Sequence, residues 1–468
     1  MAKYKAYPEY KDSGVEWLGE IPRHWTLSKF RYNFAFSKGL TITKENLRDE
    51  GIPCVNYGEV HSKYGFEVDP RVHTLKCVDE KYLKDNASSL LLNGDIVFAD
   101  TSEDLEGSGN FTQLISDTRT FAGYHTIISR PFRRGNARFY AYLLDCQQLR
   151  TQVRTAVKGV KVFSVTQAIL RNLSIWLPSE KEQQRIAAFL DHETAKIDNL
   201  IEKQQQLIEL LKEKRQAVIS HAVTKGLNPD VPMKYSGVEW LGEVPEHWSI
   251  CRIKQLSLQI SKGTTPSTLG GDFVDEGIRF LKAENIGKSK EVNFSPQFYI
   301  TNFVDKQISR SRLQERDVLV IIAGATTGMA SVLQKDLLPA NTNQAVSFIR
   351  PKNAAFAEWI YYWLGTEFTQ SVIWMGAVQA AQPNLSMESL GNIPILVPPQ
   401  DETKSICLEI EKQSIEFENL ISKAELAIEL MQERRTALIS AAVTGKIDVR
   451  DWVAPNACEA EVSQEATA

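Results

Sequence analysis

Few residue patterns in this chain are of the kind that carry out catalysis. Gly287-Lys288-Ser289 matches the end of a phosphate-binding loop, but Lys282 stands where the first glycine of that loop is required. The glycine-containing run 324–328 does not fit the dinucleotide-binding pattern. The chain has neither an Asn-Pro-Pro-aromatic sequence of the type that amino-methyltransferases use nor an acidic and lysine pattern typical of nucleases. We therefore expect a protein that is not an enzyme.

Metal and redox chemistry are also poorly represented. The six cysteines are scattered without a C-x-x-C pair, which favours reduced thiols over a zinc site or a disulfide framework. His24 and His247 each precede a tryptophan, and no second histidine or carboxylate recurs beside them at a ligand spacing. We interpret both histidines as packing residues. The sequence predicts no metal and no cofactor bound by this chain.

Nucleic-acid binding is better supported, although the net charge of the whole chain is −4. Residues 26–176 carry a net charge of +4 and residues 249–396 a net charge of +2, so the remainder carries −10. The excess positive charge lies in the two segments where a polyanion would bind. Between Arg138 and Lys161, five basic residues accompany a single acid, Asp145. This run is a candidate phosphate contact, with a solvated helix face as the alternative.

Polar side chains in the loops of the same two segments are candidates for DNA contacts. Asn and Gln can bond bidentately to adenine and Arg to guanine, whereas Lys mainly contacts phosphate. For each residue, an ordinary loop role is the alternative. The candidates in the first segment are Lys38, Asn56, Tyr57, Arg119, Tyr124, His125, Arg154, Lys158 and Lys161. The candidates in the second are Lys262, Thr264, Lys282, Asn285, Thr326, Thr327, Asn343, Gln344, Gln379, Gln382 and Asn384.

Two repeated elements bracket each of these segments and must position their side chains. Residues 13–25 return as residues 236–248, with eleven of the thirteen residues identical. Each copy holds two Trp, a Pro and turn glycines, so we interpret it as an apolar staple that fixes the entry of the chain into a domain. The second element, residues 178–224, returns without a gap at residues 398–444.

The second repeat predicts two long helices that pack on each other. Its apolar residues alternate at steps of four and three, the spacing of a coiled-coil seam. Neither copy has an internal Pro or Gly, and each follows a Pro that suits a helix start. An antiparallel pairing would bring Arg215 toward residues 414–417 and Arg435 toward residues 194–197. The predicted seam residues are Leu190, Ile197, Ile201, Ile208, Leu211, Phe417, Ile421, Ile428 and Met431.

The segments between staple and helix predict mixed domains. Apolar runs at 95–99 and 318–322 predict buried strands, and runs at 139–144 and 359–364 predict helices. The predicted fold class is α+β, an internal repeat of two similar domains separated by two long antiparallel helices. The predicted boundaries are 1–176 and 226–396 for the domains with their staples, 177–225 and 397–446 for the helices, and 447–468 for a C-terminal tail expected to be disordered.

This layout resembles the specificity (S) subunit of type I restriction-modification systems. The resemblance rests on the E-W-L-G-E-x-P-x-H-W box at 16–25 and 239–248 and on the P-x-x-E-x-x-x-I helix openings. It implies that residues 26–176 and 249–396 are target-recognition domains that read the two halves of a split, asymmetric site in double-stranded DNA. It also implies that the repeated helices dock two methyltransferase (M) subunits and, through them, restriction and translocase (R) subunits. Those partners would use S-adenosylmethionine, ATP and Mg for adenine-N6 methylation and ATP-dependent cleavage.

Other readings of the same layout are a coiled-coil scaffold and a sequence-independent DNA-binding adaptor, whose helices would recruit partners without base-specific contacts. A single-chain enzyme that reads and modifies DNA would need a catalytic core for which this chain has no room. The sequence has no run of about 20 apolar residues and no signal peptide at its start. We therefore expect a cytoplasmic protein without membrane contact.

Overall fold

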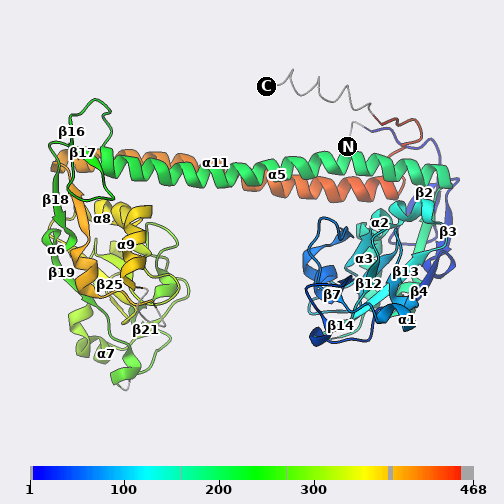
Figure 1. Cartoon of the computed structure of the whole chain (residues 1–468), viewed down its shortest axis with the longest axis horizontal. Coiled ribbons are helices and arrows are strands. Elements are labelled where there is room, and N and C mark those ends of the chain that lie inside the picture. Colours follow the sequence, from blue (N-terminus) through cyan, green and yellow to red (C-terminus); the bar gives the residue numbers. More distant parts are fainter. Residues whose placement is uncertain (1–3, 160, 270, 378–382, 455–468) are drawn as a thin grey trace. The chain divides into compact units, whose positions relative to one another are not determined.

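The chain folds into two compact units, shown in the cartoon of Figure 1. The structure, a computed structural model, describes residues 4–159, 161–269, 271–377 and 383–454. Unit 1 is formed by the described parts of residues 1–204 and 426–468, and unit 2 by those of residues 205–425. Both units combine sheets with helices, so the fold class is α+β as predicted.

Unit 1 is built on two sheets. The larger has the strand order β4-β13-β9-β11-β6 and the smaller the order β7-β5-β12-β8, while β1 with β2, β3 with β15, and β10 with β14 form separate pairs. The strands are β1 (Tyr10–Asp12), β2 (Glu20–Pro22), β3 (Thr26–Lys29), β4 (Phe34–Lys38), β5 (Ile52–Val55), β6 (Phe66–Val68), β7 (Cys77–Val78), β8 (Leu90–Leu91), β9 (Ile96–Ala99), β10 (Thr101–Ser102), β11 (Phe111–Leu114), β12 (Thr120–Ala122), β13 (Thr126–Pro131), β14 (Phe163–Ser164) and β15 (Ser174–Leu177). The short helices are α1 (Tyr82–Asp85), α2 (Ala137–Asp145), α3 (Gln147–Ala156) and α4 (Gln167–Asn172).

Unit 2 repeats this plan. Its larger sheet has the order β19-β25-β22-β23 and its smaller sheet the order β21-β20-β24, with β16 paired to β17 and β18 to β26. The strands are β16 (Met233–Tyr235), β17 (Glu243–Pro245), β18 (Ser249–Arg252), β19 (Ser257–Lys262), β20 (Ile278–Leu281), β21 (Tyr299–Ile300), β22 (Val318–Ile321), β23 (Ala330–Val332), β24 (Ala340–Thr342), β25 (Val346–Pro351) and β26 (Pro394–Val397). The short helices are α6 (Ile253–Leu256), α7 (Asn302–Gln307), α8 (Phe356–Leu364), α9 (Glu367–Ala377) and α10 (Met387–Asn392).

The central strand of each larger sheet is covered on both faces. All four residues of β9 are buried, and successive side chains point to opposite faces of a strand. Ile96 and Phe98 belong to the core that includes helix α2, whereas Val97 and Ala99 belong to the core of the smaller sheet. The same alternation divides β22 between the core that includes α8 and a second core. The predicted strands and helices of both domains are therefore confirmed.

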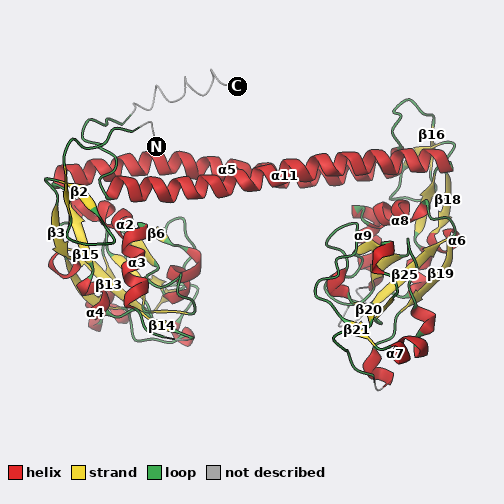
Figure 2. Ribbon diagram, turned by 180° about the vertical axis from the view of Figure 1, so that it is seen from behind, coloured by secondary structure: helices red, strands yellow, loops and turns green. Residues whose placement is uncertain are grey.

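One long helix follows the last strand of each domain, and Figure 2 draws both helices without a break. Helix α5 (Glu180–Lys225) has 46 residues and helix α11 (Gln400–Val443) has 44. Each begins shortly after a Pro, as the sequence predicts, and each belongs partly to unit 1 and partly to unit 2. Within the residues that the structure describes, no helix combines the length and the apolar character needed to span a membrane.

The two helices are antiparallel, because the first part of α5 packs on the last part of α11 in unit 1. Leu190 and Ile197 share the unit 1 core with Leu438 and Ala442. All nine predicted seam residues are buried or partly buried. Arg435 Nε donates to Asp198 Oδ1 at 2.9 Å in unit 1. In unit 2, Arg215 Nη1 donates to Glu418 Oε1 at 3.5 Å. Each arginine thus meets a residue one position beyond its predicted range.

The prediction of a disordered tail at residues 447–468 is wrong for the first residues of this range. Ile447 and Val449 are buried, and the Asp448 N–H donates to the Lys5 carbonyl at 2.7 Å. The Trp452 ring lies 5.6 Å from the ring of Phe189 on α5. These residues cover apolar surface at the start of α5, which composition alone did not reveal. The remainder of the predicted tail, 455–468, lies outside the described residues.

Candidate nucleic-acid interface

In unit 1, the loops that follow β4, β5 and β12 meet at one place, which we call junction 1 (residues 38–40, 56–58 and 123–126). The Gly39 N–H donates to the Thr126 carbonyl at 3.1 Å, and the Tyr57 N–H donates to the Tyr124 carbonyl at 3.3 Å. A Cβ atom on Gly39 would lie 2.0 Å from the Gly123 carbonyl oxygen, so this close approach requires glycine. Junction 1 therefore brings together the predicted residues Lys38, Asn56, Tyr57, Tyr124 and His125.

Asp100, the residue after β9, connects junction 1 to a basic hairpin. Its N–H donates to the His125 carbonyl at 3.1 Å, and its carbonyl accepts the Val165 N–H at 2.8 Å. The hairpin, formed by the described residues 158–159 and 161–164, pairs with β10 through β14 and carries the exposed Lys158 and Lys161. The predicted phosphate contacts thus lie beside the predicted base contacts.

Unit 2 builds the same arrangement, junction 2, from residues 262–264, 322–324, 342–346 and 383–385. The Gly263 N–H donates to the Val346 carbonyl at 3.2 Å, and a Cβ on Gly263 would lie 1.9 Å from the Thr342 carbonyl oxygen. Ile322 takes the place of Asp100: its N–H donates to the Ala345 carbonyl at 2.8 Å and its carbonyl accepts from the Leu385 N–H at 2.7 Å. The backbone of the junction is therefore repeated, whereas its side chains differ.

Exposed and half-buried side chains at the two junctions are the ones available to a ligand. At junction 2, Gln344 and Asn384 are exposed, and Lys262, Thr264 and Asn343 are half-buried. Thr326 is also exposed but lies two residues beyond the junction. At junction 1, Lys38 and His125 are exposed, and Tyr57 and Tyr124 are half-buried. Arg119 is exposed but precedes β12, whereas Tyr124 follows it, so it does not join junction 1. The predicted residues Gln379 and Gln382 lie outside the described residues.

Three predicted base-contact residues have buried side chains, which corrects their assignment. The Asn56 amide donates to the Cys54 carbonyl at 3.2 Å. The Asn285 amide donates to the Asn293 and Pro296 carbonyls, both at 2.9 Å. The Thr327 hydroxyl donates to the Gly324 carbonyl at 2.7 Å. Because a buried amide or hydroxyl must be satisfied internally, these residues fix loop geometry.

The basic residues of unit 1 fall into two groups. Arg138 is ion-paired with both Glu67 and Asp191, and Arg150 is ion-paired with Asp145. These two guanidiniums, which belong to the basic run noted in the sequence, are held inside the unit. Lys158 and Lys161 remain on the surface, while Arg154, half-buried, donates to the Glu106 carbonyl at 2.8 Å.

Lys282 of unit 2 is engaged by aromatic rings. Its ammonium lies 3.4 Å from the centroid of the Phe298 ring and 4.3 Å from that of Phe273. Such cation–π contacts stabilise a lysine in place. Lys282 is therefore less available to phosphate than Lys262.

Acidic residues stand next to junction 1. Asp100 Oδ1 lies 3.2 Å from His125 Nδ1, and Glu103 and Asp104 follow β10 as exposed residues. Burial raises the pKa of the Tyr57 hydroxyl, and the charges of Glu103, Asp104 and Asp100 raise it further. Carboxylates can accept hydrogen bonds from cytosine amino groups, a chemistry that sequence inspection did not assign to these positions.

A buried ion pair lies at the start of the strand β9 in unit 1 and of the strand β22 in unit 2, at the opposite strand end from each junction. The Asp95 carboxylate, fully buried, contacts Arg130 at 3.4 Å and Arg134 at 3.0 Å. In unit 2, Arg350 donates two hydrogen bonds to Asp317, at 2.9 and 2.7 Å. Burial raises the pKa of both carboxyl groups against the opposing effect of the arginines. These pairs link the central strand of each sheet to its neighbour.

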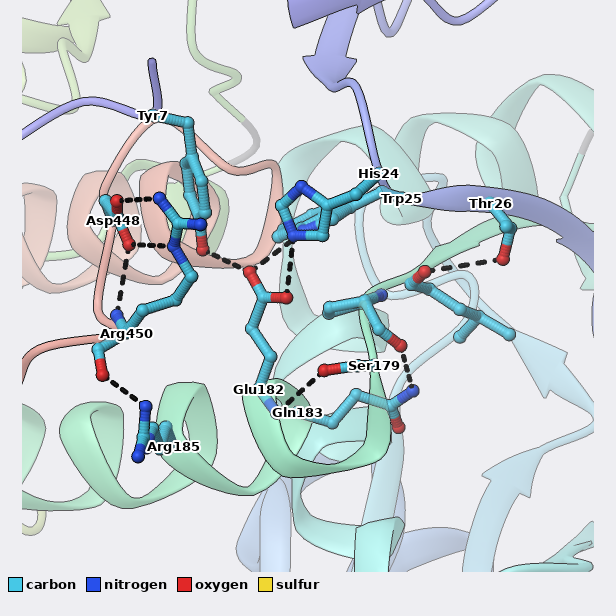
Figure 3. A network of polar contacts seen from close by, with 12 residues as sticks. Tyr7, His24, Trp25, Thr26, Ser179, Glu182, Gln183, Arg185, Asp448 and Arg450 are labelled. Atoms are coloured by element: carbon cyan, nitrogen blue, oxygen red, sulfur yellow. Dashed lines mark hydrogen bonds and ion pairs between the residues drawn. The ribbon is translucent and has the colours of Figure 1, made fainter. Parts of the chain in front are cut away.

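The staple is fastened to the long helix by a carboxylate, in a cluster shown in Figure 3. Glu182 on α5 accepts hydrogen bonds from the Tyr7 hydroxyl at 2.6 Å and from Trp25 Nε1 at 3.0 Å, and its Oε2 lies 2.9 Å from His24 Nε2. Burial and the hydrogen bond to Glu182 raise the pKa of the Tyr7 hydroxyl well above its usual value. The Arg450 guanidinium lies 5.0 Å from the centroid of the Tyr7 ring.

The same fastening recurs in unit 2, which corrects the interpretation of the histidines. Glu402 on α11 accepts from Trp248 Nε1 at 3.1 Å, and its Oε2 lies 2.7 Å from His247 Nε2. Each histidine therefore has a carboxylate partner, although it was predicted to have none. The sequence shows that the glutamate of the helix opening recurs with the His-Trp pair, but this recurrence alone does not show that the residues are in contact.

No group of three or more His, Cys, Asp or Glu side chains that could hold a metal occurs among the described residues. Two α+β units that share a fold, carry unlike loop side chains and each contain part of both long helices define an internally duplicated two-domain protein. A family model described as the type I restriction modification DNA specificity domain matches residues 25–210 and again residues 245–430. The chain belongs to this family.

Individual relatives agree with this assignment. The chain is 25% identical over 322 residues to the type I restriction enzyme MjaVIII specificity subunit of Methanocaldococcus jannaschii, covering 67% of this chain and 70% of the relative. It is 24% identical over 330 residues to the EcoBI specificity subunit of Escherichia coli, covering 69% and 68%. It is 22% identical over 444 residues to the putative MjaX specificity subunit of M. jannaschii, covering 92% and 96%. Specificity subunits are non-catalytic.

A solved structure from work on complex assembly and conformational transition of the type I restriction-modification system has a similar fold. It aligns with a TM-score of 0.69 at 16% identity, covering 91% of this chain and 99% of the other. At this level of identity the likeness establishes the fold.

Proposed function

We propose that this chain is the DNA sequence-recognition subunit of a type I restriction-modification complex. It reads a bipartite, asymmetric site in double-stranded DNA, with junction 1 contacting one half and junction 2 the other. The single observation that carries this proposal is the repetition of one backbone junction with two different sets of side chains. A repeated junction backbone that carries different side chains suits two domains that recognise different DNA sequences.

The chemistry available at each junction differs. Junction 1 offers Tyr57, Tyr124 and His125 with acidic neighbours, and its hairpin offers Lys158 and Lys161 to phosphates. Junction 2 offers the amides of Gln344 and Asn384, which suit adenine edges. The two half-sites should therefore differ in sequence.

The helices α5 and α11 are the surfaces on which methyltransferase subunits dock, and restriction subunits join through them. Equivalent leucines are exposed on both helices: Leu200 corresponds to Leu420, and Leu210 to Leu430. Because one apolar pattern occurs twice, it suits two copies of the same partner. S-adenosylmethionine, ATP and Mg are used by the partners, this chain itself is non-catalytic, and the complex works on DNA in the cytoplasm.

Reconstitution tests this function. The purified chain is mixed with its cognate methyltransferase subunit, S-adenosylmethionine and genomic DNA, and methylated adenines are mapped. Methylation confined to one split sequence is the expected result. Methylation without sequence preference would favour a scaffold or adaptor, and methylation without the partner would contradict the assignment as a non-catalytic subunit.

A further inference from the structure

Unit 2 contains a cavity of about 640 Å³ beside the long helices. Its walls come from α5, α11, α8 and the strand edge near β23, and they include Arg215, Ile219, Ile415, Tyr362, Met329 and Lys290. Apolar and charged side chains therefore face the same space. All of these residues belong to unit 2.

The internal repeat shows what fills the equivalent place in unit 1. There, β6 pairs with β11 in parallel, with Glu67 opposite Gln113. In unit 2, Glu291 forms the matching parallel bridge with Val332. This register makes Lys290 the counterpart of Phe66, the residue before the glutamate. Unit 1 thus has an aromatic ring where unit 2 has a lysine.

The Phe66 ring is held by residues whose counterparts line the cavity. Its centroid lies 4.9 Å from that of Tyr142, and the Arg435 guanidinium lies 5.7 Å from the ring. The counterparts of Tyr142 and Arg435, at a shift of 220 residues, are Tyr362 and Arg215. The walls of an aromatic site are therefore present in unit 2 without the ring.

Two further replacements enlarge the space in unit 2. By strand register, Phe111 of β11, which packs on Phe66 with ring centroids 6.2 Å apart, corresponds to Ala330 of β23. Asp145 at the end of α2 corresponds to Gly365. Ala330 and Gly365 are smaller than Phe111 and Asp145, so unit 2 has open volume where unit 1 has side chains.

In unit 1, the backbone is strained at Phe66, the residue whose ring fills the equivalent space. Phe66 has a φ of 75°, in the left-handed region that bulky residues rarely adopt. Such strain persists only where the surrounding contacts outweigh it. The packing of the Phe66 ring against the tilted Tyr142 ring and near two guanidiniums is therefore a favourable arrangement.

We propose that the cavity of unit 2 is a socket for an aromatic side chain of the docked methyltransferase subunit. This inference rests on the proposed function. The occupant is a polypeptide side chain because α5 and α11, the proposed docking helices, form part of the wall. The inserted ring would lie against Tyr362 with Arg215 over it, as Phe66 does in unit 1. An aromatic anchor in a partly apolar pocket is a typical centre of binding energy.

The proposal makes the two docking surfaces unequal. A partner subunit that docks against unit 2 gains an aromatic anchor, whereas the partner that docks against unit 1 meets a site already filled by Phe66. The two partner subunits should therefore bind with different affinities although they contact repeated helices.

The test fills the socket from within the chain. Lys290→Phe places a ring at the position of Phe66, and Met329→Trp fills the same cavity from another element. Lys290→Ala is the matched control, because it removes the same ion pair with Glu411 without filling the space. Binding of the purified cognate methyltransferase subunit is measured by calorimetry and native mass spectrometry. Either filling variant should weaken one of two binding steps by at least about tenfold, and the control should not.

Three outcomes would overturn the proposal and leave the proposed function standing. If the wild-type chain binds two partner subunits and both filling variants bind them with unchanged affinities, the socket is wrong while the proposed function stands. If Lys290→Ala weakens binding as much as Lys290→Phe, the ion pair and not the space is responsible. If free indole binds the wild-type chain and not Lys290→Phe while partner binding is unchanged, the cavity takes a small aromatic ligand. A wild-type chain that binds no partner subunit would instead refute the proposed function as well.

Discussion

The Trp25 indole donates its Nε1–H to Glu182 Oε1 at 3.0 Å, and this bond joins the start of the domain to the start of the long helix. Trp248 makes the same bond to Glu402 at 3.1 Å. In each unit, a histidine contacts the other oxygen of the same carboxylate. In each unit, one glutamate therefore joins the repeated His-Trp pair to the start of the long helix.

Replacing this glutamate should destabilise unit 1 more than unit 2. Glu182→Gln leaves an amide N–H facing buried donors, and an unsatisfied buried donor costs about 1–3 kcal/mol. Glu182 has three partners and a side chain that is 5% exposed, whereas Glu402 has two partners and is 31% exposed. Urea denaturation followed by tryptophan fluorescence should show a larger loss of unfolding free energy for Glu182→Gln than for Glu402→Gln. Equal losses would contradict the argument from burial.

The hairpin lysines should contribute to DNA affinity without contributing to specificity. Lys158→Ala with Lys161→Ala would remove two of the proposed phosphate contacts, so affinity should fall for every sequence. The slope of log affinity against log salt should become shallower by about 2, because each contact contributes about 0.9. Fluorescence anisotropy over a salt series measures this slope. An unchanged slope would remove both lysines from the interface, and Lys282→Ala provides a control whose ammonium is held by aromatic rings.

Junction 1 should not tolerate a side chain at its close backbone approach. Gly39→Ala would place a Cβ 2.0 Å from the Gly123 carbonyl oxygen, so the loops must move apart. We expect a loss of stability of roughly 1–3 kcal/mol and weaker binding to the half-site that unit 1 reads. Gly58→Ala is the matched control, because a Cβ there meets nothing within 4 Å. Equal melting temperatures of Gly39→Ala and Gly58→Ala would refute the prediction that junction 1 requires glycine at position 39.

Exchange of residues 26–176 for the equivalent domain of a relative should change one half of the DNA target only. The segment contains all of junction 1 and none of junction 2. Methylation mapping after reconstitution with the methyltransferase subunit identifies both halves at single-base resolution. A change in both halves would contradict the separation of the two readers.

The sequence allowed the repeated elements to be predicted because their signals are local. Helices α5 and α11 follow from apolar spacing and from the absence of Pro and Gly. The strands around Val97 and Leu319 follow from short apolar runs between turns. The register of the helix pair was not determined from the sequence: matching the helix ends placed Arg215 and Arg435 one residue short of their partners, Glu418 and Asp198.

Side-chain roles at the junctions were predicted less well. Asn56 and Asn285 have the residue type of a base contact, but their amides are buried and bonded to backbone carbonyls. Polarity in a loop does not distinguish a side chain that points outward from one that holds the loop. The difference depends on where the neighbouring loops pass.

The sequence by itself determined the duplication, the two long helices and the buried strands and helices predicted for each domain, and it carries the resemblance to a family, since each of these is written in the order of residues along the chain. Only the tertiary structure decided that His24 meets Glu182, a contact between residues 158 positions apart. It also decided that Phe66 fills a space in unit 1 that Lys290 leaves open in unit 2. Contacts of this kind arise when distant segments pack together, so no spacing within either segment encodes them.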